Sequence, residues 1–290
     1  MTEAQLNALI TVADCRSFTL AATQLGVSQS AISHAIRQLE QTLKVKLLRR
    51  KGADIFLTDV GEQILRNARE ITGLLDGIRQ EASNVEGVKI GTLRIGSFGL
   101  SASLRLLPEI LEVFHTKHPN IDVYIDEGTD QEVSRWLQER RIDIGFVVLP
   151  EQNFETIHLV TDQLVAVLPE NHRLSGQTSI SLSDICDEPF ILTGAGSGRI
   201  VQNMFAREQL SPRIQYRISQ ILSTLAYIKK GEAITVMAEL SLPEKSDDCG
   251  YVALPLNPQY NREVGLAYLP QEQQSPATRA FIKLAKKFSS

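Results

Sequence analysis

The sequence lacks several features that mark whole classes of protein. Its 290 residues include three cysteines without a CxxC pair, so we expect neither a disulfide framework nor a thiolate zinc site. No apolar run reaches the roughly 18 residues that a transmembrane helix needs, so no membrane partner is expected. The start of the chain carries Glu3 and no basic-then-apolar secretion signal. Together these absences favour a location in the reducing cytoplasm.

Glycine, proline and charge are also too scarce for a collagen-like or disordered chain. The sequence has 18 Gly and 11 Pro, with 43% hydrophobic and 22% charged residues, which is typical of globular domains. At roughly 100–200 residues per domain, the length fits two or three domains.

The charge is unevenly distributed, although the formal net charge is only −4. Residues 91–290 carry 19 Lys and Arg against 24 Asp and Glu. Residues 16–51, by contrast, carry seven Lys and Arg against Glu40 alone. Such a basic island on an acidic chain is typical of contact with a polyanion, and a solvated basic surface is the alternative.

The first forty residues predict three short helices. Apolar residues recur at three- and four-residue spacing over 6–13 and 18–25, and Gly26 ends the second helix. Ser28 is a suitable N-cap for a third helix that runs to about Leu39. The inward face of this third helix is expected to comprise Ala31, Ile32, Ala35, Ile36 and Leu39.

The outward face of the third helix carries short or forked polar side chains instead of the Glu–Lys pairs common on stabilising surfaces. Gln29 and Arg37 are the predicted base readers, because Gln pairs bidentately with adenine and Arg with guanine in the major groove. This layout is typical of a helix-turn-helix, and the corner of an ordinary three-helix bundle is the alternative. The predicted DNA-contacting residues here are Ser28, Gln29, Ser30, Ser33, His34 and Arg37.

A short β-ribbon is predicted over residues 54–58, in the position of a wing. Wings usually reach DNA through basic tips, but the tip at 52–54 is Gly-Ala-Asp. We therefore assign phosphate contact to Arg49, Arg50 and Lys51.

A long helical segment follows from Val60 and loosens into a predicted hinge over residues 84–91. Its apolar positions have a mean spacing near 3.5, which is typical of a coiled-coil seam and predicts a homodimer. Packing of this helix on the C-terminal part of its own chain is the alternative. In a dimer, two recognition helices would meet the half-sites of an inverted repeat in double-stranded DNA. The seam residues are Val60, Ile64, Ala68, Ile71, Leu75, Ile78, Ala82 and Val85.

From Gly91 onward, short apolar strands alternate with amphipathic helices, which favours mostly parallel α/β sheets. The candidate strands are 92–96, 122–127, 142–148, 164–168, 189–192, 214–218, 233–237, 251–254 and 264–269. The candidate helices are 102–118, 131–140, 197–208, 219–230 and 276–288. Small polar residues gather at four strand-to-helix junctions, namely 97–101, 128–129, 193–199 and 219–220. Helix starts of this kind suit a carboxylate or oxyanion, and simple helix capping is the alternative at each.

The first sixty residues resemble the N-terminal domain of LysR-type transcriptional regulators. The resemblance rests on FTLAA at 18–22, LGVSQSAIS at 25–33, IRQLE at 36–40 and LTDVG at 57–61. His34 and Ala35 stand where the family commonly has Arg-Gln, and Leu48 where it commonly has Phe. Sparser motifs resemble the effector-binding domain of the same family, namely LRIG at 93–96, RIDIG at 141–145, EPFI at 188–191 and SGR at 197–199.

The resemblance implies a multi-domain α/β protein. It places a winged helix-turn-helix domain at 1–58, a linker and dimerisation helix at 59–89, and an effector-binding domain at 90–290 that is similar to type II periplasmic binding proteins. Subdomain I would cover about 91–161 and 268–290, and subdomain II about 162–267, with the crossover strands near 161–164 and 260–269. It also implies homotetramers and a small-molecule effector. The small polar residues at the four strand-to-helix junctions suggest that this effector is anionic. The residues carried over to the effector cleft are Ser97, Ser101, Thr129, Phe146, Thr193, Ser197, Arg199 and Gln220.

We therefore expect a sequence-specific DNA-binding transcriptional regulator whose promoter binding or activation a small effector modulates. An enzyme is disfavoured, because the five histidines form no HExxH motif and no Ser/His/Asp set is legible. Neither a metal nor a cofactor is expected. A cysteine-based redox sensor of the same fold is the remaining alternative, although Cys15, Cys186 and Cys249 are expected to be buried and inert.

Overall fold

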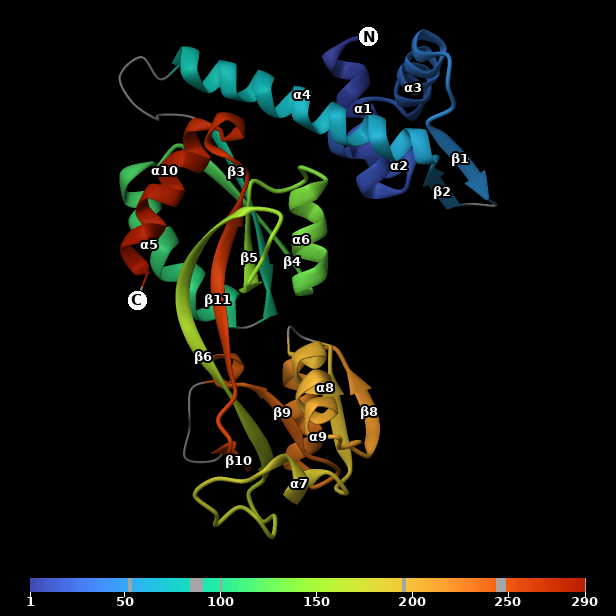
Figure 1. Cartoon of the computed structure of the whole chain (residues 1–290). Coiled ribbons are helices and arrows are strands. Elements are labelled where there is room, and N and C mark those ends of the chain that lie inside the picture. Colours follow the sequence, from blue (N-terminus) through green and yellow to red (C-terminus); the bar gives the residue numbers. More distant parts are fainter. Residues whose placement is uncertain (52–53, 84–90, 100, 195–196, 244–248, 290) are drawn as a thin grey trace.

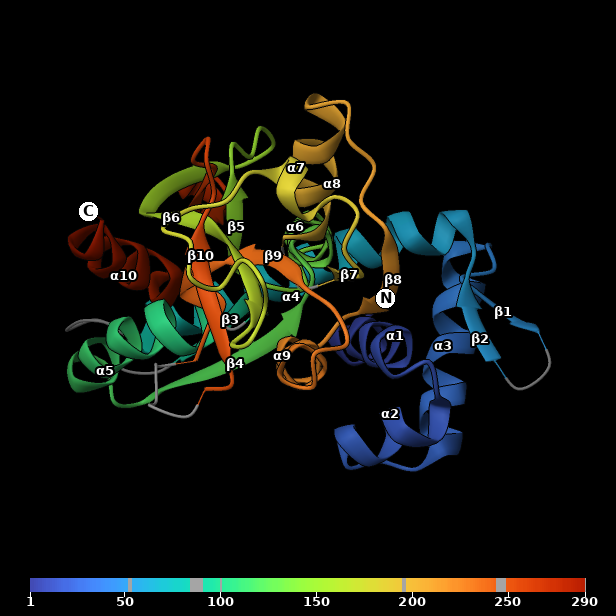
Figure 2. The ribbon, with the colours of Figure 1, turned by 90° about the horizontal axis from the view of Figure 1, so that it is seen from below.

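A computed structural model describes residues 1–51, 54–83, 91–99, 101–194, 197–243 and 249–289. The N-terminal part is a three-helix domain with a β-hairpin, which projects to one side of the rest of the chain (Figure 2). Its helices are α1 (Glu3–Cys15), α2 (Phe18–Leu25) and α3 (Gln29–Leu43). The hairpin joins β1 (Leu48–Lys51) to β2 (Asp54–Leu57) in antiparallel register. The predicted wing tip at 52–53 lies outside the described residues.

Local capping explains where these helices begin and end. The Ser17 and Ser28 hydroxyls each accept a backbone N–H at the start of α2 and α3. Gly26 ends α2 with a φ of 65°, the left-handed conformation that glycine adopts without strain. Leu9 and Leu39 are fully buried at the centre of the resulting core.

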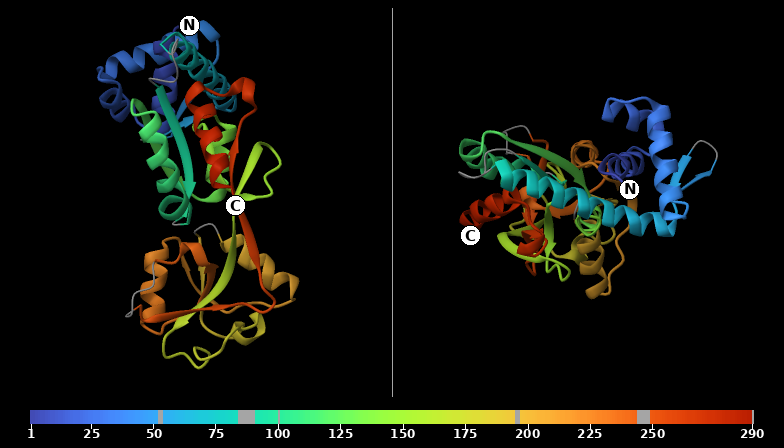
Figure 3. Two further views of the ribbon diagram at one scale, coloured as in Figure 1. Left: turned by 90° about the vertical axis from the view of Figure 1, so that its left-hand side faces the viewer. Right: turned by 90° about the horizontal axis from the view of Figure 1, so that it is seen from above.

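Helix α4 (Asp59–Ser83) extends from this domain and lies across the top of the C-terminal part (Figure 3). It packs closely at its start, where a Cβ on Gly61 would lie 2.2 Å from the Leu47 carbonyl oxygen. Leu65 and Ala68 are buried in the core of the N-terminal domain. The predicted seam is therefore split: Ala68 is buried in the N-terminal core, whereas Val60, Ile71 and Ile78 stay exposed and Leu75 is half-buried. Leu74, which is outside the predicted seam, is exposed as well. Val85 and the predicted hinge at 84–90 lie outside the described residues.

The C-terminal part forms two lobes joined by two long strands (Figure 1; Figure 3, left). Its largest sheet contains β3 (Gly91–Phe98), β4 (Ile121–Gly128), β5 (Ile144–Leu149), β6 (Glu155–Pro169), β9 (Thr235–Ala238), β10 (Tyr251–Pro255) and β11 (Asn261–Tyr268). The strand order is β10-β6-β11-β5-β3-β4, and β9 also pairs with β6. In the lower lobe of Figure 1, β7 (Phe190–Thr193) pairs in parallel with β8 (Ile214–Ile218).

Helices cover both sheets. The upper lobe carries the π-helix η1 (Ser101–Leu106), α5 (Leu107–Lys117), α6 (Asp130–Gln138), η3 (Gln271–Gln273), α10 (Pro276–Ala285) and η4 (Lys286–Phe288). The lower lobe carries α7 (Leu182–Ile185), α8 (Gly198–Arg207), α9 (Ile221–Lys229) and η2 (Glu239–Ser241). Each lobe has its own core: Phe114 meets Phe281 in one, and Phe190 meets Phe205 in the other. Only β6 and β11 run through both lobes among the described strands.

The prediction of mostly parallel sheets is wrong. β3 pairs in parallel with β4 and β5, but β11 is antiparallel to β5 and β6, and β6 is antiparallel to β9 and β10. Every described antiparallel pair in the C-terminal part involves β6 or β11, the strands that run through both lobes, and β6 extends to Glu155, well before the strand expected over 164–168. The expected helix over 102–118 is divided, with the π-helical turn preceding α5. No described helix is long and apolar enough to cross a bilayer.

Candidate nucleic-acid interface and ligand site

The polar face of α3 is directed to solvent. Ser28, Gln29, Ser30, His34 and Arg37 are exposed, and Ser33 is half-buried. The side chains are ordered along the helix, since Gln29 Nε2 donates a hydrogen bond to Ser33 Oγ at 3.0 Å. The Ser28 and Ser30 hydroxyls are hydrogen-bonded to each other at 2.9 Å. A continuous row of hydrogen-bonding groups is thus presented outward on one helix face.

The opposite face of α3 anchors it to the domain. Ile32, Ile36 and Leu39 are buried, with exposed fractions of 3%, 4% and 0%. Ala31, predicted to lie on this inward face, is exposed instead, because it sits beside the polar row at the first turn. The helix therefore has one buried and one free side, as the sequence predicted.

A buried carboxylate that sequence reasoning did not single out connects α3 to the hairpin. Glu40 Oε1 accepts hydrogen bonds from the Leu47 and Leu48 backbone N–H groups, and Oε2 accepts one from Lys46 Nζ at 2.6 Å. Burial raises the pKa of Glu40, but the hydrogen bonds from Lys46 and the two amides outweigh it and hold the pKa below its ordinary value. The ionised Glu40 thus fixes the angle between the helix and the hairpin.

The predicted phosphate contacts lie on β1. Arg49 is exposed, pairs in register with Phe56, and lines a groove of about 450 Å³ between the hairpin, α4 and α6. The side chains of Arg50 and Lys51 lie outside the described residues, so their contact with phosphates stays a prediction, as does that of Arg49.

The candidate ligand residues of the upper lobe lie at the carboxyl ends of β3 and β4 or just after them. Ser97 is fully buried, and its hydroxyl is hydrogen-bonded to that of Ser103 at 2.8 Å. Thr129 caps α6 in a reciprocal box with Glu132, which accepts from the Thr129 amide and hydroxyl. Both residues therefore have structural partners already. The Ser101 side chain lies outside the described residues.

The candidate residues of the lower lobe lie at the end of β7 and at the starts of α8 and α9, and α8 begins at the end of that lobe nearest the upper one (Figure 1). Thr193 ends β7 and is buried, and a Cβ on Gly198 would lie 2.1 Å from its carbonyl oxygen. Ser197 is 1% exposed, and its Oγ has no hydrogen-bond partner among the described residues. Arg199 and Gln220 are exposed at the starts of α8 and α9. An unsatisfied buried hydroxyl costs free energy unless something pairs with it.

Phe146, a further candidate for the ligand site, lies in the core of the upper lobe. Its side chain is fully buried in the upper-lobe core together with Leu266 and Val264. Helices cover both faces of this part of the sheet, so Ile144, Phe146 and their neighbours alike point into packed interior. The contact of Phe146 with a ligand stays a prediction.

A buried ion pair on the two connecting strands also escaped the sequence analysis. Arg262 on β11 and Asp162 on β6 are both 1% exposed, and Nη2 lies 2.8 Å from Oδ2. Asp162 Oδ1 accepts from the Leu240 amide in the lower lobe at 3.1 Å, while the Arg262 guanidinium lies 5.5 Å from the Phe98 ring centre in the upper lobe. The pair therefore touches both lobes.

The cysteines are free thiols, and each is partly exposed, not fully buried as expected. Cys15 donates a hydrogen bond to Gln24 Oε1 at 3.1 Å, and Cys186 donates one to the Ser211 carbonyl at 3.3 Å. Burial, with a contribution from Asp14, raises the pKa of Cys15, which disfavours the reactive thiolate. Within the described part of the chain, no group of three His, Cys, Asp or Glu residues could hold a metal ion.

Comparisons with known proteins agree with this architecture. Residues 4–62 match the model of the "bacterial regulatory helix-turn-helix protein, lysR family", and residues 86–289 match that of the "LysR substrate binding domain". The chain is 33% identical to the uncharacterised regulator YvbU of Bacillus subtilis, over 99% of this chain and 98% of that protein. It is 26% identical to the transcriptional activator CmpR of Synechocystis sp., over 82% of this chain and 79% of that one.

Solved structures share the fold over the full length. Full-length OxyR from Pseudomonas aeruginosa has a TM-score of 0.75 at 23% identity, covering 99% of this chain and 94% of that one. CbnR, solved in complex with its target DNA, has a TM-score of 0.65 at 23% identity, and each chain is fully covered. With a helix-turn-helix match, a substrate-domain match and a full-length relative in agreement, the chain belongs to the LysR family of transcriptional regulators.

Proposed function

We propose that this DNA-binding regulator acts in the cytoplasm as a homodimer or homotetramer on an inverted-repeat operator, and that a small anion bound in its C-terminal domain modulates it. The observation that carries the proposal is the α3 face, whose outward groups can hydrogen-bond to base edges while its aliphatic side is buried. Ser28, Gln29, Ser30, Ser33, His34 and Arg37 would enter the major groove, and Arg49, Arg50 and Lys51 would contact phosphates.

The exposed side of α4 supports the dimer. Val60, Ile71, Leu74 and Ile78 are 44%, 38%, 54% and 62% exposed. The last three follow one another at three- and four-residue steps and lie on one line of the helix, as in a coiled-coil seam. A second copy of α4 would cover them, and the two-fold axis of such a dimer would relate two copies of α3. Tetramers would then form from two such dimers.

Selection of binding sites from a random duplex library tests the operator. We expect the bound sequences to converge on an inverted repeat, with half-sites separated by about one helical turn of 10–10.5 base pairs or a multiple of it. Sedimentation of the same preparation should give a dimer or a larger assembly. Enrichment of a single unrepeated half-site, or a monomer in sedimentation, would contradict the proposed symmetry.

The start of α8 supports the anionic effector. The helix has ten residues, its N-terminus carries partial positive charge, and Ser197 holds a buried hydroxyl with no partner in the described chain. Arg199 stands exposed one residue into the helix. A carboxylate or oxyanion that accepts from the Ser197 hydroxyl and pairs with Arg199 would satisfy both groups. Ser97, Ser101, Thr129, Thr193 and Gln220 are the proposed surroundings.

Substitution Ser197→Ala tests this assignment. Because the hydroxyl is buried and unpaired, its removal is expected to leave the free energy of unfolding unchanged or to raise it by up to about 1 kcal/mol. The matched control Ser97→Ala removes a hydroxyl that is hydrogen-bonded to Ser103 and should cost about 1 kcal/mol. Urea unfolding measures both. Carboxylates and oxyanions that raise the melting temperature of the wild type should fail to do so for Ser197→Ala. A loss in Ser197→Ala as large as in the control would mean that the hydroxyl serves the fold.

A further inference from the structure

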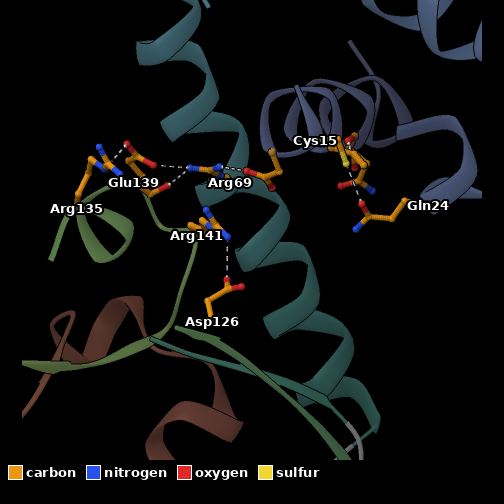
Figure 4. A network of polar contacts seen from close by, with 10 residues as sticks. Cys15, Gln24, Arg69, Asp126, Arg135, Glu139 and Arg141 are labelled. Carbon is orange, nitrogen blue, oxygen red and sulfur yellow. Dashed lines mark hydrogen bonds and ion pairs between the residues drawn. The ribbon is translucent and has the colours of Figure 1, made fainter. Parts of the chain in front are cut away.

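A buried arginine joins the two halves of the molecule. Arg69 lies on α4 and is 7% exposed. Its Nη2 lies 2.5 Å from Asp14 Oδ1, at the end of α1 in the N-terminal domain. Its Nη1 donates to the Glu139 side chain at 3.3 Å and to the Glu139 carbonyl at 3.2 Å, at the end of α6 in the upper lobe. One guanidinium thus connects three elements (Figure 4).

Neighbouring charges reinforce this junction. Arg140 Nη2 lies 3.1 Å from Glu70 on α4 and donates to Gln273 Oε1 at 2.7 Å. Arg141 pairs with Asp126 on β4 at 3.3 Å (Figure 4). The Arg141 guanidinium also stacks over the Trp136 ring at 4.6 Å. The residues that follow α6 are therefore tied both to α4 and to the sheet.

Burial distinguishes this junction from an ordinary surface ion pair. Arg79 on α4 also pairs with α1, through Glu3 at 2.6 Å, but Arg79 is 59% exposed and the contact stays within the N-terminal part. Exposed pairs of that kind contribute little, because water solvates the charges equally well. The Arg69 guanidinium is withdrawn from water, so loss of a carboxylate partner is strongly unfavourable. The docked arrangement therefore depends on both Asp14 and Glu139.

Helix α6 links this junction to the candidate ligand site. It begins at the Thr129 cap, at the carboxyl end of β4, and ends at Glu139. Nine helical residues span about 13.5 Å. Val133, Trp136 and Leu137 are buried against the sheet. Trp136 lies so close that a Cβ on Gly128 would be 2.5 Å from its ring. Such a short, tightly packed helix moves as one unit.

We propose that α6 couples the ligand site to the DNA-binding domain, with Arg69 as the latch that holds its far end against α1 and α4. The inference rests on the proposed function, because Thr129 is taken as part of the ligand site. A ligand that shifts the start of α6 would move Glu139 relative to Arg69 and so alter how the N-terminal domain is docked. Coupling is reciprocal, so DNA binding must in turn change the start of α6.

Hydrogen–deuterium exchange of the full-length protein tests both the Arg69 latch and the coupling through α6. The variant Glu139→Gln keeps the size of the side chain and removes its charge, and Arg69→Met is a second variant with an uncharged chain of similar length. Glu3→Gln is the matched control, since it removes the partner of Arg79 on the same helix. Without DNA, amides 135–141 should exchange about three- to tenfold faster in both test variants than in the wild type and the control.

The second measurement adds a 40-base-pair duplex of mixed sequence at low ionic strength. We expect DNA to change the exchange of residues 128–133 in the wild type and in Glu3→Gln, and to leave it unchanged in Glu139→Gln and Arg69→Met. Unaltered exchange of 135–141 in the two test variants would overturn the latch. The coupling would be overturned if DNA binding left the exchange of residues 128–133 unchanged in the wild type. It would also be overturned if DNA changed this exchange as much in Glu139→Gln and Arg69→Met as in the wild type. If the duplex binds none of the proteins, the proposed function fails, and the first measurement alone decides the latch.

Discussion

Substitution Asp162→Ala is expected to lower the free energy of unfolding by about 3–5 kcal/mol. Arg262 and Asp162 are each 1% exposed, so the variant keeps a guanidinium in the interior without its carboxylate. The loss also removes the acceptor for the Leu240 amide. An unpaired buried charge is penalised far more than the intact pair stabilises, because its hydration is not recovered.

A double variant separates this penalty from the contribution of the pair itself. Asp162→Leu combined with Arg262→Met replaces both charges with apolar side chains of comparable size, and should recover most of the lost stability. Urea unfolding midpoints of the single and double variants give the comparison. A loss below about 1 kcal/mol in Asp162→Ala, a value typical of exposed pairs, would show that water reaches the site.

The Asp162–Arg262 pair lies where the two lobes are joined. Asp162 and Arg262 lie on the two strands that join the lobes, and their contacts reach Leu240 on one side and Phe98 on the other. Any movement of one lobe relative to the other must bend these strands close to the pair. Such bending would therefore be centred on this pair, near Phe98 at the end of β3.

The N-terminal domain could be predicted because its signals are local. Ser28 and Gly26 fix the ends of helices through bonds to residues three or four positions away. Amphipathic spacing then separates the faces of α3, and the structure buries Ile32, Ile36 and Leu39 as expected. The wing and the family resemblance can also be predicted from short segments of sequence, of about five to nine residues each. For this reason the candidate DNA-contacting residues could be named from sequence.

The ligand site and the inter-domain contacts could not be predicted with the same precision, because they depend on residues far apart in the chain. Asp162 and Arg262 are 100 positions apart, and Arg69 and Glu139 are 70 apart. β5 is covered on both faces, so its sequence has no alternation to indicate whether Phe146 or a neighbour faces the ligand site. In the sequence Glu40 looks like an ordinary surface charge, because its burial depends on the hairpin residues that hydrogen-bond to it, such as Leu47.

The α3 interpretation predicts the effect of Arg37→Ala on DNA binding. Arg37 is exposed on the outward face, where its fork can pair bidentately with guanine. Its loss should weaken binding to the selected operator by about 1–3 kcal/mol and relax the preference at one base position. Titration of fluorescent duplexes carrying each base at that position measures both effects.

The neighbouring residue supplies the control for Arg37→Ala. Gln38 is also exposed on α3, but its side chain accepts a hydrogen bond from Gln5 on α1 at 3.1 Å and is therefore directed away from the polar row. Gln38→Ala should leave operator affinity and base preference unchanged. Equal affinity of Arg37→Ala and the wild type would mean that a different face of the domain reads the bases. Uniform weakening on every sequence, with the salt dependence reduced by about one phosphate contact, would instead assign Arg37 to the DNA backbone.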